Sequence, residues 1–299
     1  DALTSALLAM RCPLLVAPAM NVHMWRNPAT QVNVATLQSR GIRFVMPQTG
    51  LLACGDVGEG KLADVNDIVA AALDALSPAP KDMVGKSVVV TAGPTHEAID
   101  PVRYIANAST GKMGYAIARE AARRGAVVTL VTGPVAIEAP AGVEVVPVVS
   151  AAEMHDAAMA AFDKADAAIC AAAVADYTPA SPASHKLKKG VDDLTTIRLV
   201  QTEDILAELS ASKGHRVVVG FAAETNDLLK NAHEKLLHKG CDLIVANDVS
   251  RADSTFGADT SRVAFVWPNR TEQLDTLPLA DVASAICDRV STLVVGEVA

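Results

Sequence analysis

Ser87-Val-Val-Val-Thr-Ala92 is an apolar run of strand type, and it leads through Gly93-Pro94-Thr95 and a longer loop to Ser109-Thr-Gly-Lys-Met-Gly114. A strand followed by a glycine-rich helix start is where α/β proteins bind phosphates, because free backbone N–H groups and the helix dipole point at the anion. The pattern is neither G-x-G-x-x-G nor a Walker loop, since residue 106 is an alanine and Lys112 precedes a methionine. An ordinary strand-to-helix turn is the alternative.

Outward from this stretch, strand and helix patterns alternate to the end of the chain. Strands are predicted at 86–92, 126–132, 143–148, 165–173, 216–221, 241–246 and 262–267. Helices are predicted at 112–124, 151–163, 203–212, 227–239 and 279–295. Runs that are apolar throughout, such as 167–173, indicate strands buried on both faces and therefore parallel. We predict an α/β fold over residues 85–299 with a Rossmann-like, doubly wound, mostly parallel sheet.

Residues 1–76 form a separate, smaller α/β region. The patterns predict a strand at 12–17, a helix from Pro28 to Arg40, a strand from Arg43 to Met46, a mobile loop over 49–62, and a helix capped by Asn66 or Asp67 that reaches about Leu76. The chain opens within an amphipathic stretch, which we interpret as the tail of a domain whose beginning is missing. Residues 77–84, rich in proline and polar side chains at their start, are predicted to be a linker.

Composition excludes several classes of protein. The chain has 299 residues with a formal charge of −8, whereas general nucleic-acid binding needs a dominant basic surface. The longest apolar run, 167–175, is too short to span a membrane, and no signal-peptide pattern opens the chain. The five cysteines form no CxxC pair, so neither a zinc site nor a disulfide framework is indicated, and we expect a cytoplasmic protein.

A second segment whose side chains could take part in binding or catalysis begins at Asp176. This aspartate follows an apolar strand, at the carboxyl end where ligands sit in open α/β sheets. Ten residues later come Lys186, Lys188 and Lys189, whose charges suit a triphosphate and its leaving pyrophosphate. Asp176 is a candidate for binding a ribose hydroxyl or a magnesium ion. The alternative is a solvated loop with a surface lysine run.

Further candidates lie after other strands. Phe221 follows a strand and either contacts a base or fills the core, and Lys235 and Lys239 lie four residues apart on one helix face. The two lysines also complement the dipole at the helix end, which needs no ligand. In the first region, Asn21 could present its amide to a carboxylate or a flavin. Cys54 lies in the glycine-rich loop, as a proton donor or as an unremarkable thiol.

Together these segments resemble a known family. Ala92-Gly-Pro-Thr-His-Glu97, Asp100-Pro-Val-Arg-Tyr-Ile-Ala-Asn107, Ser109-Thr-Gly-Lys-Met-Gly114, Ala172-Ala-Val-Ala-Asp-Tyr177, Lys186-Leu-Lys-Lys189, Gly220-Phe-Ala-Ala-Glu-Thr225 and Ala246-Asn-Asp248 resemble the phosphopantothenate–cysteine ligase domain of bacterial coenzyme A biosynthesis. Pro18-Ala-Met-Asn21 and Gly50-Leu-Leu-Ala-Cys-Gly-Asp56 look like the end of the fused phosphopantothenoylcysteine decarboxylase, a flavodoxin-like flavoprotein.

The resemblance implies a two-step ligation that uses CTP and Mg²⁺. The carboxylate of 4′-phosphopantothenate attacks the α-phosphate of CTP, and the amine of L-cysteine then displaces cytidine monophosphate from the acyl-cytidylate. By motif, the reacting groups would be served by Lys186, Asn107 and Arg103, with Ser109, Gly111 and Lys112 also at the substrate. The CTP site would comprise Cys170, Ala171, Ala172, Asp176 (also the metal ligand), Lys186, Glu203, Asp204, Ile205, Leu206, Phe221, Lys235 and Lys239. Glu203 stands where the family usually has proline.

For the decarboxylase, the resemblance implies FMN as cofactor, Asn21 at the substrate and Cys54 as proton donor. The family's catalytic histidine lies upstream of these motifs, so we expect residues 1–76 to lack decarboxylase activity. We also expect a homodimer through the ligase domain, and a higher oligomer if the decarboxylase domain is intact. An NAD(P)-binding oxidoreductase and a non-catalytic assembly domain are the competing interpretations. Against the first stand the absent G-x-G-x-x-G and the lack of an acidic residue after the strand at 126–132.

Overall fold

The computed structural model describes residues 2–52, 55–76, 80–188, 195–224, 226–249, 254–255 and 257–296. It divides into two compact units, Asp1–Pro80 and Lys81–Ala299, here called unit 1 and unit 2. The division falls within the predicted linker, of which residues 77–79 lie outside the described part. In the described residues, no helix is both long enough and apolar enough to span a membrane.

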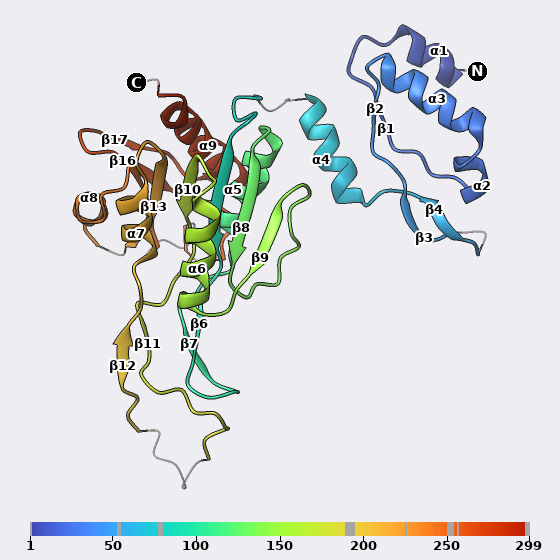
Figure 1. Cartoon of the computed structure of the whole chain (residues 1–299). Coiled ribbons are helices and arrows are strands. Elements are labelled where there is room, and N and C mark those ends of the chain that lie inside the picture. The colour runs from blue at the N-terminus through green and yellow to red at the C-terminus, as the bar shows by residue number, and fades with distance from the viewer. Residues whose placement is uncertain are drawn as a thin grey trace. The chain divides into compact units, whose positions relative to one another are not determined.

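Unit 1 pairs short strands with four helices among its described residues (Figure 1). Its elements are α1 (Ala2–Ala9), β1 (Leu15–Val16), α2 (Val22–Trp25), α3 (Pro28–Ser39), β2 (Arg43–Phe44), β3 (Gln48–Leu51), β4 (Val57–Lys61) and α4 (Val65–Leu76). β1 and β2 are parallel, with α3 between them in the chain, and Asn27 caps α3 just before Pro28.

Two predictions for unit 1 are wrong. The predicted mobile loop contains an antiparallel ribbon, β3–β4. The ribbon is held because Met20 N donates to Gly60 O at 2.9 Å, and Gly60 (φ +149°) lets Met20 O approach where a Cβ would lie only 2.2 Å away. The helix α4 is capped by neither Asn66 nor Asp67, since the Asp64 carboxylate accepts from the N–H of residue 66 at 2.8 Å.

Unit 2 is built on an eight-stranded sheet in the order β17-β16-β14-β13-β10-β5-β8-β9. The sheet strands are β5 (Ser87–Ala92), β8 (Val127–Thr132), β9 (Glu144–Pro147), β10 (Ala167–Cys170), β13 (Val217–Glu224), β14 (Leu243–Asp248), β16 (Val263–Val266) and β17 (Thr271–Gln273). The strands from β5 to β14 in this list pair in parallel, whereas β16 pairs antiparallel with β14 and β17 pairs antiparallel with β16. The prediction of a large, mostly parallel sheet is confirmed, and the six parallel strands follow the strand order of dinucleotide-binding sheets.

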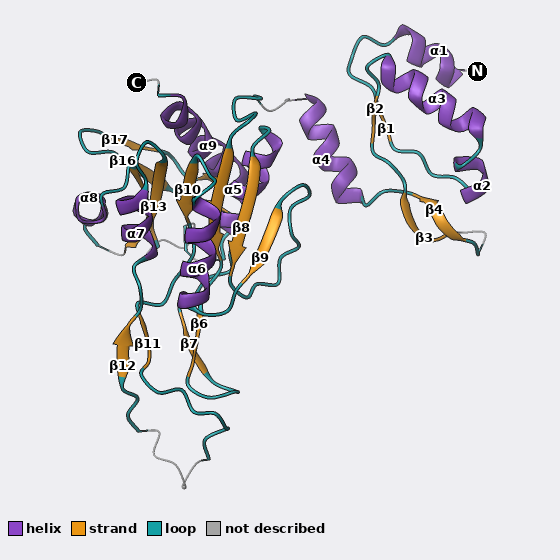
Figure 2. Cartoon of the chain, viewed as in Figure 1, coloured by secondary structure: helices purple, strands orange, loops and turns teal. Residues whose placement is uncertain are grey.

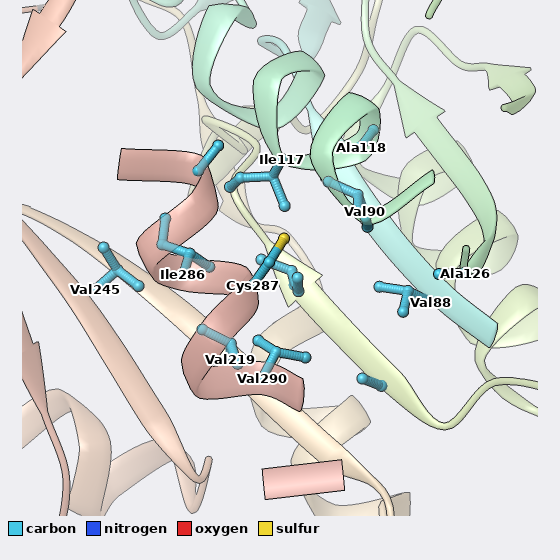
Figure 3. Packing of buried hydrophobic residues seen from close by; sticks show 14 of the residues in the cluster. Val88, Val90, Ile117, Ala118, Ala126, Val219, Val245, Ile286, Cys287 and Val290 are labelled. Carbon is cyan, nitrogen blue, oxygen red and sulfur yellow. The ribbon is translucent and has the colours of Figure 1, made fainter. Parts of the chain in front are cut away.

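Helices cover both faces of this sheet. They are α5 (Lys112–Arg123), α6 (Ala151–Phe162), α7 (Ile205–Ser212), α8 (Leu228–Lys239) and α9 (Leu279–Val295). α5 and α9 pack on the face that carries Val88 and Val90, while α6, α7 and α8 pack on the face that carries Val89. Figure 3 shows Ile286, Cys287 and Val290 of α9 directed into the first of these layers. The alternation of strand side chains between faces therefore builds two apolar layers.

Two ribbons extend beyond the carboxyl end of the sheet (Figure 2). One is β6 (His96–Ala98) with β7 (Tyr104–Ala106), and the other is β11 (Tyr177–Pro179) with β12 (Leu199–Gln201). β11 contacts β6, so the ribbons support each other. The predicted strand 165–173 is shorter in the structure, because the chain leaves the sheet after residue 170 and makes only one further bridge, from residue 173 to Pro94. A small pair, β15 (Thr260–Ser261) with β18 (Leu277–Pro278), lies before α9.

A buried cation joins α5 to α9. The Arg124 side chain, 1% exposed, pairs with Glu120, Asp82 and Asp288, and its guanidinium also donates to Ser284. Burial alone would lower its pKa, but the hydrogen bonds that it donates to Glu120 and Asp288 outweigh this and raise the pKa. Its five N–H donors thus find partners on three segments of the chain.

Candidate active site

Two adjoining cavities open at the carboxyl end of the parallel strands in unit 2. The first has a volume of about 490 Å³ and the second about 460 Å³. The walls of the first are Thr91, Cys170, Ala172, Val174, Asp176, Tyr177, Gln201, Thr202, Glu203, Asp204, Ile205, Leu206, Phe221, Lys235 and Lys239. The second lies over the glycine-rich helix start, and the sequence-predicted residues that line it but not the first are Asn107, Ser109, Gly111, Lys112 and Ala171.

The first cavity brings together ten of the twelve residues that were predicted to form a nucleotide site. They are Cys170, Ala172, Asp176, Glu203, Asp204, Ile205, Leu206, Phe221, Lys235 and Lys239. They come from β10 and its following loop, the start of α7, β13 and α8. These segments meet because parallel strands present their carboxyl ends at one edge. Ala172, Val174, Asp176, Phe221 and Lys235 line both cavities, so ligands in the two would meet there.

The lysines of α8 place positive charge in the first cavity. Lys235 Nζ donates to Phe221 O at 2.8 Å, and Lys239 forms a short ion pair with Asp204. Asp204 also caps α7, because its carboxylate accepts from Ala207 N at 3.0 Å. Burial would raise the pKa of Asp204, but the hydrogen bond from Lys239 outweighs it and keeps this pKa below its usual value. The cavity therefore holds two cations and the ionised carboxylate of Asp204.

Cys170 contributes a neutral group to the same cavity. Burial raises the pKa of its thiol to about 12. A thiol of this pKa carries almost no thiolate at neutral pH, so it is no nucleophile there. Cys170 therefore contributes to the lining of the cavity and does not act as a nucleophile.

Three threonines fix the loop after β10, and the sequence analysis did not single them out. Thr91 and Thr95 accept from the N–H groups of residues 172 and 175 at 3.3 and 3.0 Å. Thr202 bonds in the other direction, since its hydroxyl donates to the carbonyl of residue 175 at 2.7 Å and its N–H donates to Asp176 O at 3.0 Å. The position of Thr91 and Thr95 around the end of a central strand was the available signal.

The second cavity is bounded by an open helix start. Gly111, with φ of +76°, is the N-cap of α5 and supplies no side-chain cap, so N–H groups of the first turn are available to an anion. Lys112 Nζ donates to Gly257 O at 2.8 Å and pairs with Asp259 at 2.7 Å. Asn107 Nδ2 donates to Val174 O at 2.8 Å, which ties this loop to the wall that both cavities share.

The far wall of the second cavity was largely missed. Asn247 Oδ1 accepts from the hydroxyls of Ser254 and Ser261, and both serines are nearly inaccessible to solvent. Asn247 belongs to the Ala246-Asn-Asp248 motif of the sequence analysis and lies near the end of β14. The serines carry no periodic pattern, and only the folded chain places them beside the asparagine.

Lys186 and Arg103 line neither cavity, in contrast to the predicted site. Asp100, whose side chain is fully buried, accepts from Leu187 N at 3.2 Å, and Arg103 donates to Leu187 O at 2.5 Å. The exposed Lys186 is therefore held on the ribbon region by its neighbour. Burial would raise the pKa of Asp100, but hydrogen bonds from the N–H groups of Val102, Leu187 and Arg103 outweigh this and lower the pKa to about 2. Lys189 lies outside the described residues.

In unit 1, Asn21 is the N-cap of α2. Its Oδ1 accepts from His23 N at 2.8 Å and its Nδ2 donates to Asp56 at 2.9 Å. Cys54 lies outside the described residues. Throughout the part of the chain that the structure describes, no group of three or more His, Cys, Asp or Glu side chains is arranged to hold a metal ion.

Fold and site define a class: a two-unit α/β protein whose larger unit holds adjoining ligand cavities at the carboxyl edge of a mostly parallel sheet. Residues 83–294 match the family model "DNA/pantothenate metabolism flavoprotein C-terminal domain", and residues 1–77 match the model "Flavoprotein". The chain belongs to the family of coenzyme A biosynthesis bifunctional proteins.

Individual relatives agree with this assignment. The chain is 45% identical to the Coenzyme A biosynthesis bifunctional protein CoaBC of Bacillus subtilis (strain 168), over 98% of this chain and 73% of that protein. It is 46% identical to the protein of the same name from Vibrio vulnificus (strain YJ016), with the same coverage. A solved C-terminal domain of such a protein superposes with a TM-score of 0.63 at 36% identity, covering 73% of this chain and 100% of that one.

Proposed function

We propose that unit 2 ligates 4′-phosphopantothenate to L-cysteine at the expense of CTP, in coenzyme A biosynthesis. The observation that carries the proposal is the meeting of ten predicted nucleotide residues around one cavity, which adjoins a second cavity at the glycine-rich start of α5. Family membership supports the place in coenzyme A biosynthesis. We further propose that CTP is the nucleotide, that Mg²⁺ is required, and that the individual residues have the roles described below.

In the proposed reaction, the nucleotide occupies the first cavity and phosphopantothenate the second. The carboxylate attacks the α-phosphorus, so that an acyl C–O–P bond forms as the bond to pyrophosphate breaks. The amine of cysteine then attacks the acyl carbon, and cytidine monophosphate leaves with the former carboxylate oxygen. Activation is needed because a free carboxylate is a poor electrophile.

The shared wall of the two cavities is where these atoms would meet. Lys235 lies on it and would neutralise charge that develops on the phosphates, and Lys239, which lines the first cavity but not the second, would do so there. Bound magnesium would supply further charge stabilisation to the triphosphate, next to Asp176. The uncapped start of α5 and Lys112 would bind anionic groups of phosphopantothenate.

The test is to incubate the chain with 4′-phosphopantothenate, L-cysteine, Mg²⁺ and one nucleotide at a time. Release of cytidine monophosphate with CTP, but no nucleotide monophosphate with ATP, is the expected result. Oxidation of a nicotinamide dinucleotide in parallel samples would favour the oxidoreductase instead. Turnover of no nucleoside triphosphate by folded protein would overturn the proposal.

Lys186 is proposed as a catalytic residue on the strength of the family resemblance. We expect Lys186→Ala to slow turnover by orders of magnitude, with unchanged thermal unfolding because the side chain is exposed. Lys188→Ala, two residues along the same segment, is the matched control and should retain most activity. Wild-type rates in Lys186→Ala would show that this segment is a solvated loop.

The remaining proposals concern unit 1 and assembly. We propose that unit 1 belongs to an FMN-dependent decarboxylase, in which Asn21 contacts substrate and Cys54 donates a proton. A homodimer through unit 2 is likewise proposed, and sedimentation of the chain tests it.

A further inference from the structure

His155 on α6 lies behind the first cavity and faces three carboxylates. Its Nε2 lies 2.9 Å from Glu208 on α7, while its Nδ1 lies 3.1 Å from Asp156 on its own helix and 3.5 Å from Glu203. The side chain is only 14% exposed. Both ring nitrogens therefore face acceptors. A neutral imidazole has one N–H, and only the imidazolium can donate from both nitrogens at once.

One of these carboxylates belongs to the first cavity. Glu203 lines it, directly before Asp204, which caps α7 and pairs with Lys239. Glu203 is 58% exposed, so its charge faces the solvent-filled space into which an anionic triphosphate would enter. An unpaired carboxylate at that place repels phosphates, and an imidazolium beside it offsets the repulsion.

The other neighbours of His155 do not supply this charge. α6 packs against α7, β5 and β8, and the strands β5 and β8 carry no titratable side chain. The groups that face the ring are Asp156, Glu203 and Glu208, all acidic. Burial opposes protonation, but the hydrogen bonds that the ring donates to Glu208 and Asp156, together with the charges of Glu208 and Glu203, outweigh it, so the pKa of His155 lies above its ordinary value of 6.5.

We propose that His155 is a positioning residue for nucleotide binding, which in its protonated form neutralises Glu203 and holds the start of α7 against α6. The proposal rests on the proposed function, since the ligand is a nucleoside triphosphate. It makes the affinity of the first cavity dependent on pH. The affinity is high where His155 is charged, and it falls as the pH rises through the raised pKa of His155.

The experiment measures binding of CTP with Mg²⁺ to the full chain by calorimetry, at about pH 6 and about pH 9, on either side of the histidine titration. Wild-type affinity should fall by about three- to tenfold between them, the size of one partly screened charge interaction. His155→Gln should bind weakly at both values, and Glu203→Gln tightly at both. His155→Lys, which keeps a positive charge, should restore tight binding at the higher value.

Controls separate this effect from titration of the nucleotide and from loss of structure. The terminal phosphate of CTP titrates equally in every sample, so the result is the difference between variants. Asp156→Asn is the matched control, because Asp156 faces the same ring but lines no wall of the first cavity; it should keep the pH dependence. In turnover assays, His155→Gln should raise KM for CTP and leave kcat unchanged, which general loss of structure would not do.

The outcomes distinguish the two proposals. If wild type and Glu203→Gln lose affinity for CTP in parallel as the pH rises, the role of His155 is wrong while CTP binding stands. If folded wild-type protein binds no CTP at either pH, the proposed function falls and the role of His155 falls with it.

Discussion

Gly114→Ala tests the close packing of α5 on the central strand of unit 2. Gly114 is the third residue of α5, and a Cβ built on it would lie 2.5 Å from Ala92 Cβ, 3.1 Å from Ala92 Cα and 3.2 Å from Thr91 O. Real Cβ contacts are longer than the first of these distances. The partners belong to the end of β5, a strand paired on both sides, so they cannot rotate away as a long side chain would.

Two effects of the substitution oppose each other. Alanine favours a helix over glycine by about 0.8–1.0 kcal/mol in a helix interior, and by less in the first turn. Overpacking in a fitted core costs about 1–3 kcal/mol. Because the clash involves backbone and Cβ atoms of a central strand, we expect it to exceed the gain in propensity. The predicted net loss in the free energy of unfolding is about 1–2 kcal/mol.

The assay is urea unfolding followed by fluorescence. The chain has two tryptophans, Trp25 in unit 1 and Trp267 in unit 2, so a Trp25→Phe background reports unit 2. Arg119→Ala, on the exposed face of the same helix, is the control and should change stability by less than about 0.5 kcal/mol. A Gly114→Ala midpoint equal to or above that of the parent would refute the packing argument.

Three further predictions concern charge and capping. The pKa of Asp100 is lowered in the folded chain, so its stabilising contribution is present above its unfolded pKa and lost as the pH falls towards about 2. In acid unfolding, Asp100→Asn should therefore start from a lower free energy of unfolding than the wild type, and this free energy should change less as the pH falls over that range. Arg124→Met should destabilise unit 2 by about 1.5–3 kcal/mol in denaturant titrations, because Glu120 then keeps only its pair with Arg123 and the buried bonds to Ser284 are lost, and a loss below about 1 kcal/mol would contradict this. Asp204→Ala should cost about 1 kcal/mol through loss of the α7 cap and Asp204→Asn much less, which thermal unfolding of the two variants compares.

The sequence predicted the main sheet of unit 2 because its strands are continuous apolar runs. The strand at β5 and the helices α5, α6, α8 and α9 lie within one residue of their predicted bounds. The ribbons were missed, since each of their strands in unit 2 has three residues. Nineteen residues of chain lie between β11 and β12, so no local turn signal joins them.

The nucleotide cavity was predictable for a different reason. Its walls gather at the ends of parallel strands, and topology alone brings such ends together once the sheet is known. The threonine bonds and the serines of the second cavity depend on side chains that meet only in the folded state. His155 shows the same limit, because its partners Glu203 and Glu208 lie about fifty residues further along the chain.

The spacing of the lysine segment does not determine where that segment lies in the folded chain. Ten residues separate Asp176 from Lys186, which suggested that both act at one place, yet ten extended residues can span about 33 Å. The chain does move away from Asp176, because β11 leads it out of the cavity beside the β6–β7 ribbon. Asp100 and Arg103 then hold Leu187 by both its N–H and its carbonyl. Lys186 is thus fixed to the ribbon through its neighbouring peptide. A role for Lys186 at the phosphates therefore requires the ribbon and the lysine to approach the nucleotide together, and cutting the tether with Asp100→Asn should impair turnover without changing CTP affinity in the absence of phosphopantothenate.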